Sequence, residues 1–183
     1  FPALVEVAEG WSDTASAEST RSGLAAGDGT VRREMWRPFP DTTQPDLAAH
    51  PVFDREPTAV ETLSEFASPA NDGSLYAARL TTTFVPSMSG PHHFDLASDD
   101  HSLLYPVFPG DDGERRLLAR VQGFVQAGHY DAQPSQRSGP VRLEAGVPYR
   151  LEVRHAQGGG IAHCSPPVTY PHGRVEDPLG RRP

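Results

Sequence analysis

The sequence has no lysine, a single cysteine and no long apolar run. Because Cys164 stands alone, no internal disulfide can form, and the class of small disulfide-built domains is excluded. Cys164 is therefore either a buried, inert thiol or the partner of a cysteine outside this segment. No apolar stretch reaches the roughly 18 residues that a membrane-spanning helix needs. No signal-peptide pattern opens the sequence, and we expect the chain to be a processed product or a segment of a larger protein.

Basic residues are also scarce relative to acidic ones. The sequence has 16 Lys and Arg residues against 24 Asp and Glu residues, which gives a formal net charge of −8 at pH 7. A nucleic-acid groove needs clustered basic side chains that replace counterions, so the charge balance argues against a nucleic-acid partner. The same balance argues against an anionic membrane surface as a partner, and we expect no direct membrane insertion.

Turn-forming residues, in contrast, are abundant. The chain of 183 residues has 17 glycines and 19 prolines, which break helices and fit turns. Short stretches rich in β-branched and aromatic residues lie between them, and the pattern predicts an all-β sandwich or barrel. Residues 60–66 could form a strand or one helical turn, and residues 38–57 are expected to form a long loop. The expected strands lie in residues 31–37, 75–85, 92–97, 103–108, 117–125, 141–143, 147–154 and 161–164.

Two local predictions follow from this pattern. Polar and apolar residues alternate in residues 31–37, which is typical of a half-buried strand, and we expect Trp36 to lie in the core. The segment Asp111-Asp112-Gly113 has the composition of a solvated hairpin turn, since the spacing of an EF-hand is missing.

In their order and spacing, several motifs resemble those of the PA14 domain family. The resemblance spans about residues 22–166, and Ala97-Ser98-Asp99-Asp100 followed by Leu103 is its most recognisable part. The other motifs are Arg33-Glu34-x-Trp36, Asp46-Leu47, Tyr76 before Arg79-Leu80, Pro86 with Ser89-Gly90, His93-Phe94, Gln136 with Ser138, and Val141-x-Leu143-x-Ala145-Gly146-x-x-Tyr149.

The resemblance implies an antiparallel β-sandwich or barrel with about 8–11 short strands and long loops. It also implies an extracellular or cell-surface location, since the family occurs in adhesins, toxins, glycosidase insertions and fibrocystin-like receptors. We expect a PA14-like β domain over residues 22–170, an irregular lead-in or linker over residues 1–21, and a C-terminal tail or linker over residues 171–183.

The adjacent carboxylates of Asp99 and Asp100 are the sharpest candidate site. Neighbouring carboxylates repel unless a positive charge or strong hydrogen bonding lies between them, and Ca²⁺ is a natural partner because it collects oxygen ligands. In lectin-type members of the family a similar Asp pair, joined by a cis peptide bond, binds Ca²⁺ that holds sugar hydroxyls. Alternatively, the pair caps a turn without any metal. Those lectins supply a further Asn from a C-terminal loop, whereas the matching residues 157–161 contain neither Asn nor Asp.

Other candidate sites are weaker. His101 follows the Asp pair directly and is a candidate ligand-binding residue together with Asp99 and Asp100. No H-x₃-H or C-x₂-C spacing indicates zinc. A G-x-S-x-G nucleophile elbow is absent, and the glutamates are too scattered to argue a glycosidase carboxylate pair. We therefore expect a binding or structural module and not an enzyme.

Three hypotheses of function remain open. The first is an extracellular PA14-like module for adhesion or architecture, which docks on neighbouring domains or chains of a surface assembly. The second is a calcium-dependent carbohydrate-binding module that uses Asp99 and Asp100, with glycans as partners. The third is an accessory domain of a glycan-active enzyme. The first expects large protein contacts, whereas the second expects stabilisation by Ca²⁺ and binding of glycans.

Overall fold

The computed structural model describes residues 30–107 and 116–179, except residues 42 and 44. No helix in this part of the chain is long and apolar enough to cross a membrane. The described residues form twelve strands and two short 3-10 helices, η1 (Pro51–Asp54) and η2 (Pro134–Gln136). The strands are β1 (Val31–Trp36), β2 (Ala59–Leu63), β3 (Tyr76–Phe84), β4 (Gly90–Phe94), β5 (Ala97–Asp99), β6 (His101–Val107), β7 (Ala119–Val121), β8 (Val141–Leu143), β9 (Tyr149–Gln157), β10 (His163–Ser165), β11 (Val168–Thr169) and β12 (Val175–Glu176).

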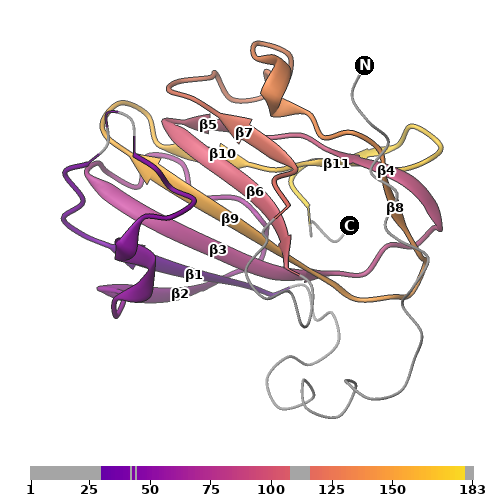
Figure 1. Cartoon of the computed structure of the whole chain (residues 1–183), viewed down its shortest axis with the longest axis horizontal. Coiled ribbons are helices and arrows are strands. Elements are labelled where there is room, and N and C mark those ends of the chain that lie inside the picture. The colour runs from indigo at the N-terminus through magenta and orange to yellow at the C-terminus, as the bar shows by residue number, and fades with distance from the viewer. Residues whose placement is uncertain (1–29, 42, 44, 108–115, 180–183) are drawn as a thin grey trace.

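The strands form a sandwich of antiparallel sheets (Figure 1). The larger sheet has six strands in the order β2-β1-β3-β9-β6-β7, and a four-stranded sheet has the order β12-β11-β4-β8. A short two-stranded sheet, β10-β5, completes the arrangement. The sandwich prediction is confirmed and the barrel alternative is not, because the larger sheet ends at β2 and β7. The strand number is slightly higher than the 8–11 expected, since β11 and β12 have only two residues each and give no periodic signal.

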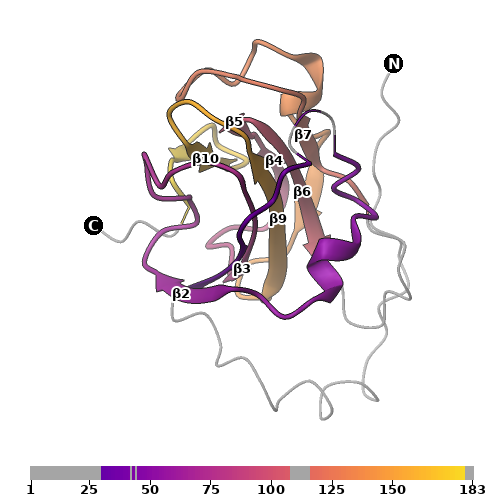
Figure 2. The same cartoon turned by 90° about the vertical axis from the view of Figure 1, so that its left-hand side faces the viewer.

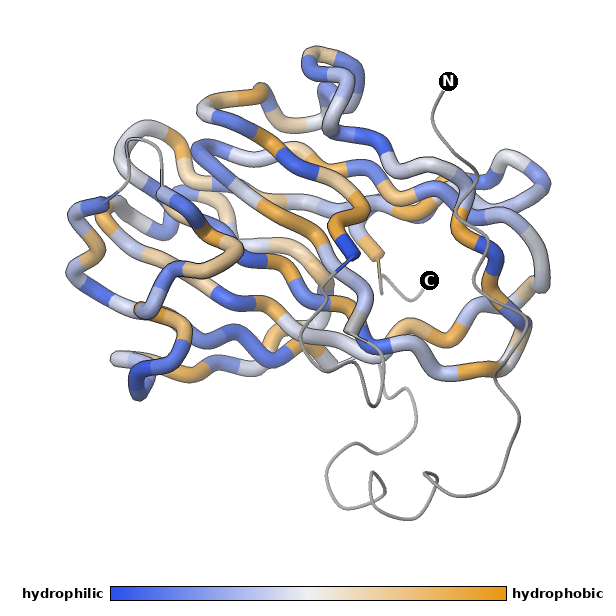
Figure 3. The backbone as a smooth tube through the Cα atoms, viewed as in Figure 1, coloured by the Kyte–Doolittle hydropathy of each residue, from blue (hydrophilic) through white to orange (hydrophobic). Residues whose placement is uncertain are grey.

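The main core lies between the larger sheet and the four-stranded sheet. Hydrophobic and hydrophilic residues lie interspersed along the strands (Figure 3). In β9, Leu151 and Val153 alternate with the charged Glu152 and Arg154, so that the apolar residues share one face of the strand. Phe84 of β3 packs edge-on against Phe94 of β4 and Tyr170, with ring centroids 6.1 and 6.2 Å apart. Leu80 and Val153, from neighbouring central strands, are fully buried in the same core.

A second core covers the outer face of the larger sheet. The segment that carries η1, drawn in indigo and purple, lies over this face (Figure 1, and Figure 2 from the side). It packs Phe39, Leu47 and Phe53 against Trp36, and the Trp36 and Phe53 rings meet edge-on at 5.3 Å. Trp36 is buried, as predicted. The prediction of a half-buried β1 is wrong, because this segment covers the face that the alternation left to solvent.

The C-terminal segment belongs to the packed body of the protein. We expected a tail or linker from residue 171, yet β12 pairs with β11 and the Leu179 side chain lies in the main core. The Phe66 amide also donates a 2.8 Å hydrogen bond to the Leu179 carbonyl. The body of the fold thus extends to at least residue 179. The lead-in of residues 1–21 and the turn at Asp111-Asp112-Gly113 lie outside the described residues.

Candidate functional site

The two candidate carboxylates lie at the corner between β5 and β6. Asp99 ends β5 and is only 4% exposed, and Asp100 links it to β6. Their peptide bond is cis, which is the arrangement that the family resemblance implies. The Ser98 hydroxyl fixes the corner from inside: it donates to the Asp100 carbonyl at 2.7 Å and lies 2.6 Å from the Ser102 hydroxyl. The role of the pair as a binding site stays a prediction.

A glycine loop between β9 and β10 closes over the carboxylates. The Gly158 amide donates a 2.8 Å hydrogen bond to Asp100 Oδ2, and the Ile161 amide donates to the Asp99 carboxylate. Gly160 has a φ of 95°, and a Cβ at this position would lie 2.7 Å from Asp99 Oδ2. Only glycine permits both that backbone conformation and that approach. The glycine run therefore lets the loop reach the carboxylate pair.

Burial and mutual repulsion set the electrostatics of the pair. Burial raises the pKa of Asp99 to about 6, and the adjacent negative charge of Asp100 adds to the rise. Hydrogen bonds from the Gln157 side chain and the Ile161 amide oppose it in part. Among the described residues, no arginine forms an ion pair with either carboxylate. Two close carboxylates without a basic partner favour the binding of a positive ion.

The donor chemistry fits Ca²⁺, which prefers carboxylate, amide and carbonyl oxygens. Within the described residues, no three or more His, Cys, Asp or Glu side chains are placed to hold a metal together. Asp99 and Asp100 would therefore supply the charge, and neutral oxygens would complete the set. Gln157, at the start of the glycine loop, has an amide side chain that hydrogen-bonds to Asp99 and could supply such an oxygen. Sequence reasoning searched this loop for Asn and Asp and passed over Gln157.

Both ring nitrogens of His101 lie beside backbone groups of other segments. Its Nδ1 accepts a 3.1 Å hydrogen bond from the Gly123 amide, and its Nε2 lies 3.1 Å from the Thr43 carbonyl. Since both ring nitrogens have backbone partners, His101 fastens two loops to the start of β6. Its suggested role in ligand binding stays a prediction.

Two buried residues of β9 hydrogen-bond to the backbone of the site. Sequence reasoning did not identify either of them as a site residue. His155 Nε2 lies 2.7 Å from the Asp99 carbonyl oxygen, and Gln157 Nε2 donates to the Gly159 carbonyl at 2.8 Å. A signal for them existed: the inward alternation of Tyr149, Leu151 and Val153 continues at positions 155 and 157. The expected strand ended at residue 154, so the signal was not used.

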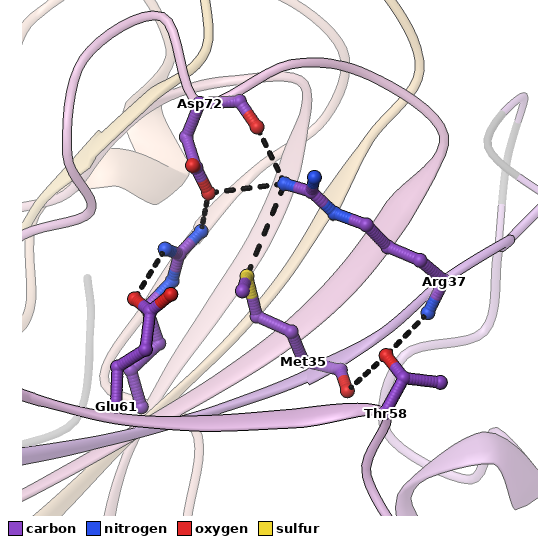
Figure 4. Close-up of polar contacts among 6 residues, drawn as sticks. Met35, Arg37, Thr58, Glu61 and Asp72 are labelled. Atoms are coloured by element: carbon purple, nitrogen blue, oxygen red, sulfur yellow. Dashed lines mark hydrogen bonds and ion pairs between the residues drawn. The ribbon is translucent and has the colours of Figure 1, made fainter.

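Behind the glycine loop lies the segment 66–75, which an ion-pair cluster fastens to β1. Leu75 donates to the Gly158 carbonyl and Asn71 to the Ala162 carbonyl, at 3.3 and 3.0 Å. Between them, the Asp72 carboxylate pairs with Arg37 at 3.1 Å (Figure 4) and also with the fully buried Arg33. The cluster thus holds the segment on which the glycine loop rests.

Cys164 lies beside this region on β10. Its side chain is buried, which agrees with the first of the two alternatives that the sequence left open, and burial raises the pKa of the thiol to about 12. A thiol in this state is inert, because the thiolate is the reactive form.

Comparison with known proteins gives a match in structure only. No protein-family model and no curated protein matches the chain. Among solved structures, the A domain of epithelial adhesin 9 from Candida glabrata, in complex with Galβ1-4GlcNAc, has a TM-score of 0.60 at 11% identity, covering 84% of this chain and 89% of that one.

Two further structures are similar. A PA14 sugar-binding domain from an RTX adhesin has a TM-score of 0.59 at 13% identity, over 81% of this chain and 94% of that one. An anti-sigma factor domain-containing protein from Clostridium clariflavum has a TM-score of 0.54 at 15% identity, over 81% of this chain and 44% of that one. At such identities the likeness concerns the fold. The chain has the PA14-like β-sandwich fold that its ordered motifs indicate.

Proposed function

We propose that this chain is a carbohydrate-binding module of an extracellular adhesive protein, with its site at Asp99 and Asp100. The observation that carries the proposal is the pair of carboxylates, the buried Asp99 and the half-buried Asp100, which has no basic partner among the described residues and is approached closely by the glycine loop. Ca²⁺ bound there would supply coordination positions for two neighbouring hydroxyl groups of a sugar. The names of the similar structures support the proposal, because one is an adhesin domain in complex with a disaccharide and another is a sugar-binding domain.

The residues around the pair have separate tasks in this proposal. Asp99 and Asp100 hold the cation and provide two negative charges, which balance its two positive charges. The Gly158 and Ile161 amides orient the carboxylates through hydrogen bonds. The loop that carries these amides keeps water away from Asp99, which strengthens every electrostatic interaction of the site.

Two exposed apolar side chains, Phe124 and Ile161, lie on loops that are hydrogen-bonded to the segment of the carboxylate pair. Phe124 and Ile161 are the most exposed of the large hydrophobic side chains among the described residues, at 63% and 67%. Ile161 adjoins Asp99 through its amide, and the Phe124 loop is fastened by the Val125 amide, which donates to the Ser98 carbonyl at 3.0 Å. Sugar rings combine hydroxyl groups with an apolar face, so a site with a few polar groups and an apolar border matches them.

A thermal-shift measurement with Ca²⁺, followed by a glycan array, tests the proposal. We expect Ca²⁺ to raise the melting temperature and to permit glycan binding, because a ligand that binds only the folded state stabilises it. Asp100→Asn should abolish both effects. The exposed Asp131 offers the matched control, since Asp131→Asn makes the same chemical change elsewhere. An unchanged melting temperature with Ca²⁺, together with no glycan signal, would contradict the proposal and favour an architectural module.

A further inference from the structure

Leu75 has a backbone conformation that is unfavourable for its side chain. Among the described residues, Asn71 and Leu75 are the only ones other than glycine with a positive φ, of 59° and 55°. Asparagine enters this left-handed region at little cost because its short polar side chain can hydrogen-bond locally, whereas a bulky apolar residue there is strained. Leucine at position 75 therefore makes the fold less stable than glycine or asparagine would.

The backbone contacts of Leu75 explain its conformation but not its residue type. Its carbonyl accepts a 2.8 Å hydrogen bond from the Phe39 amide, and its amide donates to the Gly158 carbonyl at 3.3 Å. Glycine or asparagine could make both bonds. The side chain belongs to neither of the two cores of described residues and is 48% exposed. Packing thus gives no reason for a leucine, and strain that the fold does not need indicates a function.

The position of Leu75 is beside the candidate site. Gly158, its backbone partner, donates a 2.8 Å hydrogen bond to Asp100 Oδ2. The segment 71–75 also contacts the other end of the glycine loop through a second backbone hydrogen bond. The same loop carries the exposed Ile161. Two exposed aliphatic side chains, Leu75 and Ile161, therefore lie on adjacent segments at the edge of the site.

From this arrangement we infer that Leu75 contacts the bound glycan and favours sugars that carry a methyl group. The inference rests on the proposed function and adds the class of sugar to it. Aliphatic side chains bind by burying apolar surface, and a methyl group is the most apolar substituent that a sugar offers. An acetamido group and a 6-deoxy position each supply one. Burial of one methyl group corresponds to a gain in affinity of about fourfold.

An array of single sugars in matched pairs, probed with the chain in the presence of Ca²⁺, tests the inference. The pairs are N-acetylglucosamine with glucose, N-acetylgalactosamine with galactose, and L-fucose with L-galactose. We expect the wild type to favour the methyl-bearing sugar by about fourfold in at least one pair, and the pair identifies the acetamido or the 6-deoxy group as the source. Leu75→Asn should bring this ratio to about one, whereas Leu75→Met keeps an apolar side chain and should retain it.

Thermal unfolding without sugar gives a second readout, which does not depend on the proposed function. Leu75→Asn should raise the melting temperature by about 2–4 °C, because it relieves the backbone strain. Leu117→Asn is the matched control, since Leu117 is 44% exposed and does not have a positive φ. We expect the control to leave the sugar preference unchanged and not to raise the melting temperature.

A higher melting temperature together with a lost methyl preference for Leu75→Asn supports the inference. A wild type that binds both members of every pair equally, or a Leu75→Asn variant that keeps the preference, would overturn the inference and leave the proposed function intact. A lower melting temperature for Leu75→Asn would also overturn it, because the leucine would then serve the fold. If the wild type binds no sugar at all, the inference and the proposed function both fail.

Discussion

An alanine at position 160 should displace the Asp99 carboxylate, and the structure gives the size of the effect. The added Cβ would lie 2.7 Å from Asp99 Oδ2, which is closer than these atoms can approach. A side chain at a φ of 95° adds strain of about 1–3 kcal/mol. Lost hydrogen bonds to the charged carboxylate add about 1.5–3 kcal/mol. We expect a total loss of about 2–4 kcal/mol, because the loop can relax in part.

Thermal unfolding followed by circular dichroism measures this loss. For a chain of this size each kcal/mol lowers the melting temperature by about 2–4 °C, so Gly160→Ala should unfold about 4–16 °C below the wild type. It should also lose any stabilisation by Ca²⁺. Gly159→Ala is the matched control, because no atom lies within 4 Å of its added Cβ, and we expect a change within about 0.5 kcal/mol. Equal melting temperatures for the two variants would refute the described approach of the loop to Asp99.

Three further outcomes are expected. Asp72→Ala should lower the free energy of unfolding by about 3–5 kcal/mol in urea denaturation, because it removes an ion-pair partner of the fully buried Arg33. Arg37→Ala, at an exposed side chain, should lower it by less than about 1 kcal/mol. Equal losses for the two variants would refute this reasoning. Cys164 should resist iodoacetamide in the native protein and react fully after denaturation, as read by mass spectrometry; rapid native labelling would contradict its burial. Burial lowers the pKa of His92 below its ordinary value of 6.5, so the neutral His92 stabilises the fold above pH 6.5 and this contribution is lost as the pH falls below 6.5. The difference in unfolding free energy between the wild type and His92→Gln should therefore become smaller below pH 6.5. A difference that does not change with pH would contradict the assignment.

The sequence predicted the central strands well, because their signal is local. Alternation and turn residues indicated the long strands β3, β6 and β9, although β3 and β9 are buried along most of their length and not at every second residue. The cover on the outer face of the larger sheet could not be predicted in the same way. Phe39, Leu47 and Phe53 are spaced irregularly in a segment rich in Pro and Asp, and only tertiary packing brings them onto Trp36.

The candidate site shows the same division. Asp99 and Asp100 could be predicted because they are adjacent in the sequence and belong to a motif. Gln157 could not, since its contact with Asp99 depends on the pairing of strands that are far apart in the chain. For His101, nearness in sequence suggested a role in ligand binding, whereas the two backbone partners of its ring could be found only from the fold. Site residues that are adjacent in the sequence can be recognised from the sequence alone. Site residues that come from distant segments can be recognised only once the fold is known.

The position of β9 in the larger sheet has a consequence for how the chain can be made and divided. β9 lies between β3 and β6, yet it is the last of the six strands to be synthesised. Without β9 the six-stranded sheet lacks its connecting strand, and β3 and β6 would each have one hydrogen-bonding edge without a partner. Bare edges of this kind invite pairing with other chains. Fragments that stop before β9 should therefore aggregate, and fusion or domain-dissection experiments should keep residues 30–179 together.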